Sequence, residues 1–259
     1  MSGMTEDFFL TPVHRTAGTT SAGLLPGPHE AQSGVSYGLE EVALISRHGA
    51  ETWQLPIDEW QRKQKTVFDC LAATCMLLLL APFLVAVALL IALDSPGPVL
   101  FRQSRTGLNN RPFMILKFRT MHHSMADALA EQQTTRNDPR VTRIGGMLRR
   151  FSIDELPQLI NVLRGDMSMV GPRPHAPNTK AAGQLFTDVV LNYALRHKVK
   201  PGITGWAQVN GWRGETKTVE EIRARVDHDL HYIQNWSMAF DVKIMLLTLL
   251  REVRSKTAF

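Results

Sequence analysis

The longest uncharged stretch of the chain constrains its fold more than any other feature. From Cys70 to Leu93, 24 consecutive residues carry no charge. About 20 apolar residues in a helix cross the hydrocarbon core of a bilayer, so a run of this length is typical of a membrane helix. A core helix of a soluble protein is the alternative, but it is rarely so long and so apolar on every face. We therefore expect this segment to lie in a membrane.

A proline lies near the centre of this run. Pro82 has no backbone N–H and its ring clashes with the preceding turn, so we expect the helix to kink or break there. Each arm then has about 12 residues and a length of roughly 18 Å, too short for a hydrocarbon core about 30 Å thick. Basic residues, which stay on the cytoplasmic side, flank both ends: Arg62, Lys63, Lys65, Arg102 and Arg105. These features favour a re-entrant membrane helix–break–helix hairpin over residues 57–95, with a kinked spanning helix as the alternative.

The first 56 residues differ in composition from the rest. They are rich in Gly, Pro, Ser and Thr, and few large apolar side chains occur between Thr16 and Gly38. We expect residues 1–56 to form a polar, largely disordered leader, the alternative being a long loop of a folded domain. The only cysteines, Cys70 and Cys75, share the apolar run. This pattern predicts neither a disulfide framework nor a zinc site.

The chain has a mild positive charge. It contains 29 Lys and Arg against 24 Asp and Glu, a net charge of +5 over 259 residues. Such an excess is compatible with nucleotide phosphates, anionic lipid or nucleic acid as partners. Nucleic acid fits least well, because the basic cluster lacks the interleaved aromatic side chains on which bases stack. We expect no nucleic-acid partner.

Residues 96–259 have the pattern of a compact α+β domain that is mainly helical. Two apolar runs separated by a turn at 107–111 predict a short β-hairpin, and Ser152 is placed to cap a helix that begins near Glu155. The later helices are amphipathic, which suits an interface with lipid. The predicted strands cover 99–103 and 113–119, and the predicted helices cover 121–132, 144–150, 155–163, 218–235 and 237–253.

Charged residues concentrate between Asp138 and His175. Asp154 and Glu155 are adjacent at the predicted start of a helix, and nearby arginines would keep both carboxylates ionised. An ionised Asp can attack phosphorus, and a second carboxylate can hold Mg²⁺ against substrate phosphates. The simpler reading is that acidic residues favour the first turn of a helix, and on spacing alone that reading is the stronger one.

Three other positions could bind an anion or complete the site. Arg173 lies in a rigid Gly-Pro-Arg-Pro segment and could hold a phosphate, although a structural turn is the simpler reading. Lys117 and Arg119 alternate along a strand and could face a phosphate, or could be solvated edge charges. Asp227 and Asp229 are two residues apart on a helix, so at most one of them points into a given site.

The stretch from Phe113 to Trp236 closely resembles the bacterial sugar transferases, the monotopic phosphoglycosyl transferases that begin exopolysaccharide and O-antigen assembly. The similarity extends from about residue 63 to 248. It rests on an ordered series of motifs: KFRTM at 117–121, DPRVTR at 138–143, LRRFSIDELPQ at 148–158, NVLRGDMS at 161–168, GPRP at 171–174, KPGITGW at 200–206 and NWS at 235–237.

The resemblance implies a reaction and roles for named residues. A hexose 1-phosphate passes from a UDP-hexose to undecaprenyl phosphate, and UMP is released. Asp154 corresponds to the covalent nucleophile, and Glu155 to the carboxylate that helps to hold Mg²⁺. Arg173 corresponds to the arginine linked to the uridine nucleotide, and Pro82 to the break in the re-entrant membrane helix.

Three further positions match substrate-binding residues of the family: Lys117, Arg149 and Asp229, the last with Asp227 as the alternative. The resemblance implies the cytoplasmic face of the bacterial inner membrane and contact with membrane lipid, and it leaves a homodimer open. The motif at 210–216 favours glucose or galactose as the sugar. A non-catalytic membrane scaffold for polysaccharide enzymes is the competing hypothesis, but a scaffold has no need of the Asp154–Glu155 pair.

Overall fold

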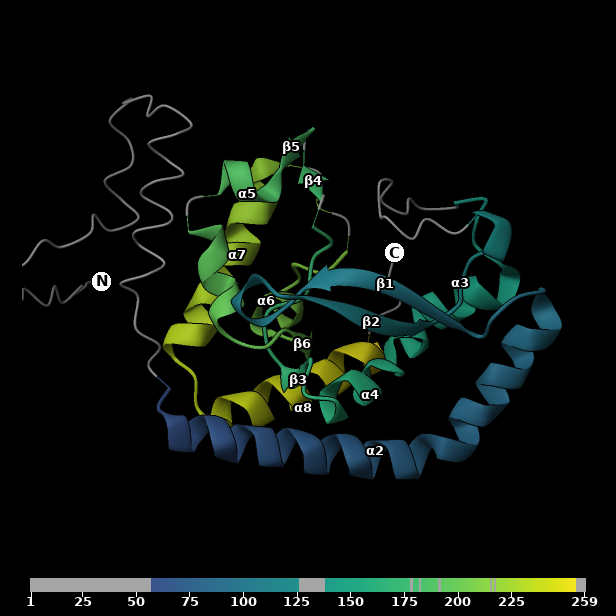
Figure 1. Ribbon diagram of the computed structural model, residues 1–259, viewed down its shortest axis with the longest axis horizontal. Helices are drawn as coiled ribbons and strands as arrows, with labels where there is room; N and C mark the ends of the chain where they lie inside the picture. The colour runs from purple at the N-terminus through teal and green to yellow at the C-terminus, as the bar shows by residue number, and fades with distance from the viewer. Residues whose placement is uncertain are drawn as a thin grey trace, which may run out of the picture. The chain divides into compact units, whose positions relative to one another are not determined.

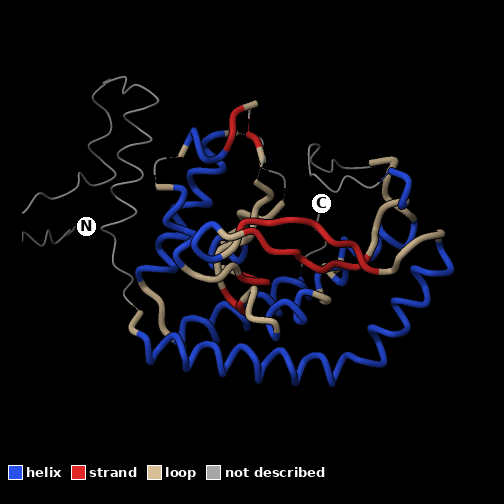
Figure 2. The backbone as a smooth tube through the Cα atoms, in the orientation of Figure 1, coloured by secondary structure: helices blue, strands red, loops and turns tan. Residues whose placement is uncertain are grey.

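The computed structural model describes residues 57–125, 138–177, 179–181, 183–190, 192–214, 216 and 218–254. Helices make up most of this part of the chain and the strands are short (Figure 2). The predicted leader over 1–56 lies outside the described residues, as does most of the predicted helix over 121–132, of which η2 (His123–Met125) is a 3-10 turn. The predicted mainly helical fold with a short β-hairpin is confirmed for the described residues.

One helix contains the whole apolar run. α2 (Glu59–Asp94) has 36 residues, and the side chain of Asp58 accepts a hydrogen bond from the backbone N–H of Gln61 at 2.7 Å. The Gln61 side chain accepts one from the Asp58 backbone in return, which completes a capping box. The most apolar 18-residue window of α2 has a mean hydropathy of 3.0, and only 11% of it is buried. By length, composition and exposure α2 is therefore a candidate membrane helix.

α2 is not broken at Pro82, in contrast to the predicted helix–break–helix. Pro82 lies inside the helix, which continues on both sides of it. Figure 1 shows α2 bending past its midpoint, and Pro82 is in that half of the helix. A proline removes one hydrogen bond and pushes away the preceding turn, so it bends a helix. The remaining i→i−4 bonds keep a long apolar helix continuous, and the segment is one bent element rather than two.

The predicted β-hairpin is confirmed. β1 (Leu100–Thr106) and β2 (Pro112–Phe118) pair antiparallel with Leu100 opposite Phe118. The turn between them contains η1 (Leu108–Asn110), where Asn109 and Asn110 adopt left-handed backbone angles. Asparagine tolerates this conformation better than most residues. The hairpin follows α2 closely in the chain, and Lys117 lies near the end of β2.

Three short helical segments follow the hairpin: α3 (Arg143–Arg150), η3 (Ile153–Glu155) and α4 (Gln158–Leu163). The predicted capping role of Ser152 is wrong. Ser152 has a left-handed backbone (φ 54°) and makes no capping bond, and α4 begins only after Pro157. Because the left-handed Ser152 interrupts the helical conformation between α3 and η3, Asp154 and Glu155 lie in a separate 3-10 turn rather than on a regular helix.

A pair of parallel strands brings two distant loops together. β3 (Ser168–Val170) pairs with β6 (Gly202–Thr204), and Gly171, just after β3, lies in close contact with Gly202 at the start of β6. A Cβ atom on Gly202 would lie 2.0 Å from the backbone nitrogen of Gly171. Only glycine, which has no Cβ atom, fits at position 202. This close contact fixes the position of Gly171, where the segment that carries Arg173 begins.

The C-terminal helices complete the core. The predicted helices over 218–235 and 237–253 are confirmed as α7 (Val219–Gln234) and α8 (Met238–Arg254). The main core cluster joins α2, α4, α7 and α8 through buried side chains such as Ala73, Leu159, Ile233 and Ile244. The remaining short elements are β4 (Lys180–Ala181), β5 (Gln184–Leu185), α5 (Phe186–Val189), η4 (Tyr193–Lys198) and α6 (Trp206–Val209).

Candidate active site

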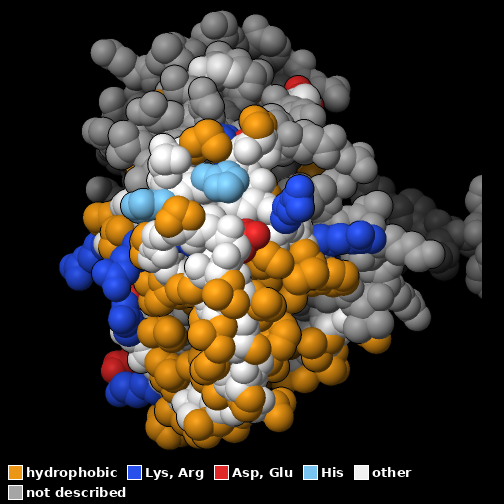
Figure 3. Space-filling view, turned by 90° about the vertical axis from the view of Figure 1, so that its right-hand side faces the viewer, with side chains coloured by type: hydrophobic (Ala, Val, Ile, Leu, Met, Phe, Trp, Pro, Cys, Tyr) orange, Lys and Arg blue, Asp and Glu red, His pale blue; other side chains and the backbone are white. Residues whose placement is uncertain are grey.

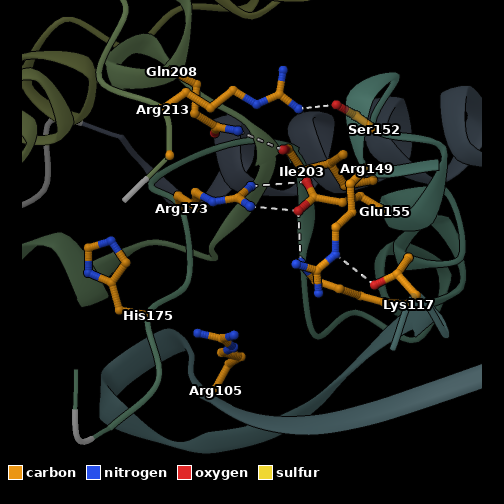
Figure 4. A network of polar contacts seen from close by, with 12 residues as sticks. Arg105, Lys117, Arg149, Ser152, Glu155, Arg173, His175, Ile203, Gln208 and Arg213 are labelled. Atoms are coloured by element: carbon orange, nitrogen blue, oxygen red, sulfur yellow. Dashed lines mark hydrogen bonds and ion pairs between the residues drawn. The ribbon is translucent and has the colours of Figure 1, made fainter. Parts of the chain in front are cut away.

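Glu155 is the centre of the polar site. Its carboxylate accepts a hydrogen bond from Lys117 Nζ at 2.8 Å and two from the Arg173 guanidinium, at 3.0 and 2.6 Å (Figure 4). These groups come from β2, from η3 and from the segment after β3. Burial acts to raise the pKa of Glu155, but Arg173 and Lys117 outweigh it and hold the pKa well below its usual range. Glu155 is therefore ionised, as predicted.

Asp154 lies next to Glu155 but has a different environment. It is 8% exposed, and among the described residues its carboxylate accepts no hydrogen bond. Burial raises its pKa to about 6, opposed by Lys117 and reinforced by the negative charge of Glu155. The neighbouring cations, which were expected to keep this carboxylate ionised, offset only part of the effect of its desolvation. At neutral pH Asp154 is still largely an unpaired anion.

Arg149 approaches the same pair from α3. Its Nε donates to Thr120 Oγ1 at 2.7 Å, and Asp154 exerts the largest favourable charge effect on its guanidinium. The structure thus brings Lys117, Arg149 and Arg173 around Asp154 and Glu155, as the predicted site requires. Two carboxylates surrounded by three cations form an arrangement that can bind a phosphate and, at the unpaired Asp154, attack its phosphorus.

Asp229 lies behind Arg173 rather than beside the carboxylate pair. It is 2% exposed, and its Oδ2 accepts hydrogen bonds from Arg196 Nε at 3.0 Å and Nη2 at 2.7 Å. Arg196 Nη2 also donates to the backbone carbonyl of Arg173 at 2.7 Å. Asp227 is exposed on the opposite side of α7. Of the two acids, Asp229 is the one linked to the site, through Arg196.

Three residues of the site, Arg213, Arg196 and His175, were not predicted from the sequence. Arg213 donates a hydrogen bond to Ser152 Oγ, two residues before Asp154 (Figure 4). Its place in the 210–216 motif was a signal that could have identified it. Arg196 comes from a segment without any pattern that indicates a buried cluster, and nothing in the charged segment that ends at His175 indicates that these two residues meet. Pro82 is exposed on α2 and belongs to the apolar helix, not to the polar site.

The residues present suit Mg²⁺ only together with a phosphate ligand. No group of three or more His, Cys, Asp or Glu side chains able to hold a metal occurs in the described part of the chain. Magnesium usually binds one or two carboxylates and completes its shell with substrate phosphates and water. The ionised Glu155 and the unpaired Asp154 meet that requirement, whereas a preformed protein cage does not exist among these residues.

The described residues also form an exposed apolar surface. Figure 3 shows hydrophobic side chains gathered over the lower half of the face that it presents, with Lys and Arg at the margins. The C-terminal half of α2 exposes Leu79 (79%) and Leu93 (84%). Other exposed side chains belong to α8, to β2 and to the α3–α4 region: Leu246, Leu249, Leu250, Met114, Met147, Phe151 and Leu163. An apolar area of this extent on described elements indicates contact with a membrane or another protein.

Comparison with known proteins gives a consistent result. A family model described as bacterial sugar transferase matches residues 60–255. An undecaprenyl-phosphate glucose phosphotransferase of Komagataeibacter xylinus is 57% identical over 204 residues, which cover 79% of this chain and 38% of that protein. The UDP-glucose:undecaprenyl-phosphate glucose-1-phosphate transferase of Escherichia coli (strain K12) is 50% identical over 207 residues, 80% of this chain and 44% of that protein.

A shorter relative is matched over nearly its whole length. The exopolysaccharide production protein PSS of Rhizobium leguminosarum bv. phaseoli is 48% identical over 195 residues, 75% of this chain and 98% of that protein. By contrast, the chain spans less than half the length of the first two relatives. The matched region includes every residue of the polar site described above.

Proposed function

Because the chain belongs to the bacterial sugar transferase family, we propose that it transfers glucose 1-phosphate from UDP-glucose to undecaprenyl phosphate and releases UMP. The observation that carries the proposal is the unpaired, buried carboxylate of Asp154 beside a Glu155 that Lys117 and Arg173 hold ionised. The relatives from K. xylinus and E. coli, both named for glucose transfer to undecaprenyl phosphate, support the choice of sugar and acceptor.

The proposed reaction has two displacements at one phosphorus. In the first, an Asp154 carboxylate oxygen bonds to the sugar-bearing phosphorus, and the bond from that phosphorus to the bridging oxygen breaks, which releases UMP. In the second, a phosphate oxygen of the lipid bonds to the phosphorus, and the bond to Asp154 breaks. The lipid-linked sugar leaves as a diphosphate, and the Asp154 carboxylate is restored.

Charge neutralisation is the main contribution of the surrounding residues. Phosphoryl transfer needs positive charge near the equatorial and leaving oxygens. Lys117, Arg149 and Arg173 would bind these oxygens, and Arg173 would exchange its bonds to Glu155 for bonds to phosphate. Mg²⁺, when bound by Glu155 and the substrate phosphates, would supply further positive charge at the leaving group. Lipid bound to the apolar surface would bring the acceptor phosphate to the same site.

Contacts at both ends of α2 support a re-entrant placement at the cytoplasmic face of the inner membrane. Near its start, Lys65 Nζ lies 2.5 Å from Asp241 Oδ2 of α8. Near its end, the Arg119 guanidinium donates to the carbonyl oxygens of Ser95 and Ile91, at 2.5 and 3.2 Å. A helix that spans a core about 30 Å thick has its ends on opposite faces. Here both ends contact the same domain.

One of the five basic residues that flank the apolar run serves another purpose. Lys65 pairs with Asp241, so its positive charge is not free to act on lipid. The topology proposal therefore depends more on the end contacts of α2 than on the count of flanking charges. The homodimer stays a prediction.

The activity is tested with purified protein in detergent, a panel of radiolabelled UDP-sugars and undecaprenyl phosphate. We expect UMP release and a labelled lipid product with UDP-glucose, and weaker or no product with UDP-galactose and UDP-N-acetylhexosamines. The Asp227→Asn variant, changed at an exposed acid, is the matched control for Asp154→Asn. A protein that binds membranes but transfers no sugar from any donor would favour the scaffold hypothesis instead.

A further inference from the structure

Three further arginines lie close to Arg173, around the buried side chain of His175. His175 is 6% exposed, and four arginines, at positions 105, 173, 196 and 225, are close enough to act on its charge. Arg173 is paired with Glu155, and Arg196 with Asp229. Arg105 and Arg225 form no ion pair within the described residues. Positive charge is therefore in excess in this part of the molecule.

Several donors in this group have no acceptor among the residues that the structure describes. The Nε atoms of Arg105 and Arg225 are buried without a hydrogen-bond partner among the described residues. Arg225 is 6% exposed, and its Nη2 donates to the carbonyl oxygen of Gly214 at 3.1 Å. Arg105 Nη2 donates to Gln103. Buried donors are almost always paired in folded proteins, so unpaired ones in a cluster indicate a missing acceptor.

The protonation of His175 adds a further donor. Its Nδ1 lies 2.8 Å from Arg196 Nη1 and 2.8 Å from the Tyr193 hydroxyl. A guanidinium has no acceptor, so Nδ1 must be the unprotonated nitrogen and Nε2 carries the hydrogen. Burial and then the neighbouring arginines hold the pKa of His175 well below its usual range, so the ring is neutral. The Nε2–H faces Arg225 Nη1 at 3.5 Å, which is one donor against another.

We propose that Arg105, Arg225 and the Nε2–H of His175 form an anion-binding subsite beside Arg173, and that its ligand is a phosphate monoester. Arginine is the side chain best suited to phosphate, since it offers several fixed donors and is always charged. Figure 4 shows Arg105 and His175 on the same side of Arg173, apart from the bonded group around Glu155. Arg105 is partly exposed, which leaves an approach for the ligand.

The identity of the phosphate rests on the proposed function. In that reaction two phosphate monoesters occur at this site, UMP as the product and undecaprenyl phosphate as the acceptor. Either would supply the oxygens that the three donors lack. The position beside Arg173, apart from the Asp154 carboxylate that attacks the phosphorus, favours UMP, because its phosphate must move away from the attacked phosphorus while the phosphosugar stays on Asp154.

The test is calorimetric binding of UMP, and separately of a short-chain polyprenyl phosphate, to the full chain in detergent. The variants are Arg105→Gln and Arg225→Gln. Each has a matched control at an exposed arginine of the same element, Arg102→Gln on β1 and Arg223→Gln on α7. We expect the first two to weaken UMP binding about tenfold or more, and the controls to bind within twofold of the unaltered protein.

Each possible result of this experiment either supports or overturns the proposed subsite. A selective loss of polyprenyl phosphate binding supports the subsite and assigns it to the lipid. Folded variants that bind both phosphates normally, or an unaltered protein that binds neither, would overturn it. If a Gln variant fails to fold, Arg105→Lys and Arg225→Lys keep the charge but lose guanidinium donors, and unchanged binding by them would also overturn it. Since binding needs no turnover, a protein that binds UMP at this subsite but transfers no sugar would reject only the proposed function.

Discussion

Arg196 connects Arg173 to a buried acid. Its Nη2 donates at 2.7 Å both to the backbone carbonyl of Arg173 and to Asp229 Oδ2, and Arg196 itself is 1% exposed. The backbone of Arg173 is thus fixed from behind, while its guanidinium holds Glu155 in front. Arg173 is thus positioned by a second ion pair, Arg196–Asp229, that has no contact with Asp154 or Glu155 among the described residues.

The Asp229→Asn variant should be strongly destabilised. It leaves the Arg196 guanidinium buried without a counter-charge, and breaking such a pair costs about 3–5 kcal/mol. The measurement is thermal unfolding of the purified protein in detergent. Asp227→Asn is the control, since this exposed acid on the same helix should change stability by no more than about 0.5 kcal/mol. Equal melting temperatures for the two variants would contradict the structural role of the Arg196–Asp229 pair.

Asp154→Asn should abolish covalent capture of the sugar phosphate. We expect intact-mass analysis of the unaltered protein, incubated with UDP-glucose and no lipid, to detect an adduct of hexose-phosphate mass on the peptide that contains residue 154. The amide of Asn is a poor nucleophile, so the variant should form no adduct and retain membrane association. Normal turnover by Asp154→Asn would exclude this residue as the nucleophile.

The first half-reaction should lose rate as the pH falls through about 6. Burial raises the pKa of Asp154 to about 6, so the carboxylate that attacks phosphorus becomes protonated below that pH. We expect kcat/KM for UMP release to fall about tenfold for each pH unit below the pKa, since it follows the ionised fraction of the free enzyme. Because the positive charge of Lys117 lowers this pKa, Lys117→Met should move the midpoint to higher pH. A profile that stays flat down to pH 4.5 would contradict the assignment.

Local sequence patterns correctly predicted the strands and helices that form through interactions between residues close together in the chain. The hairpin of β1 and β2 and the helices α7 and α8 follow from alternation, turn residues and 3.6-residue periodicity, which act within a few residues. Lys117, Arg149 and Arg173 were predicted because family motifs mark them. The structure brings all three to Asp154 and Glu155.

Other features depend on contacts between distant segments and left no local pattern. Arg196 reaches Asp229 across 33 residues, and Arg225 lies near His175 across 50. The pKa of Asp154 depends on burial, which charge spacing does not report. The continuity of α2 at Pro82 was missed for a related reason, since one residue type cannot distinguish a bend from a break.

Both ends of α2 should be protected from reagents outside the cell. The Lys65–Asp241 contact and the bonds from Arg119 to the end of α2 bind both ends to one domain. In a background with Cys70 and Cys75 replaced by Ser, we expect neither Trp60→Cys nor Arg102→Cys to react with a membrane-impermeant maleimide in intact cells. Both should react after lysis. Labelling of one end alone in intact cells would favour the spanning helix.

Adjacent glycines in α3 should respond in opposite directions to alanine. A Cβ on Gly145 would lie 2.1 Å from the backbone oxygen of Thr120, whereas one on Gly146 would meet only Val141 Cγ1, at 3.9 Å. Gly145→Ala must therefore push α3 away from the segment whose Thr120 hydroxyl holds Arg149, and we expect lower stability and slower adduct formation. Gly146→Ala should stabilise the protein by about 1 kcal/mol, because alanine favours the helix interior. Thermal unfolding and the rate of adduct formation measure both effects, and a stable, fully active Gly145→Ala variant would show that α3 does not pack closely on Thr120.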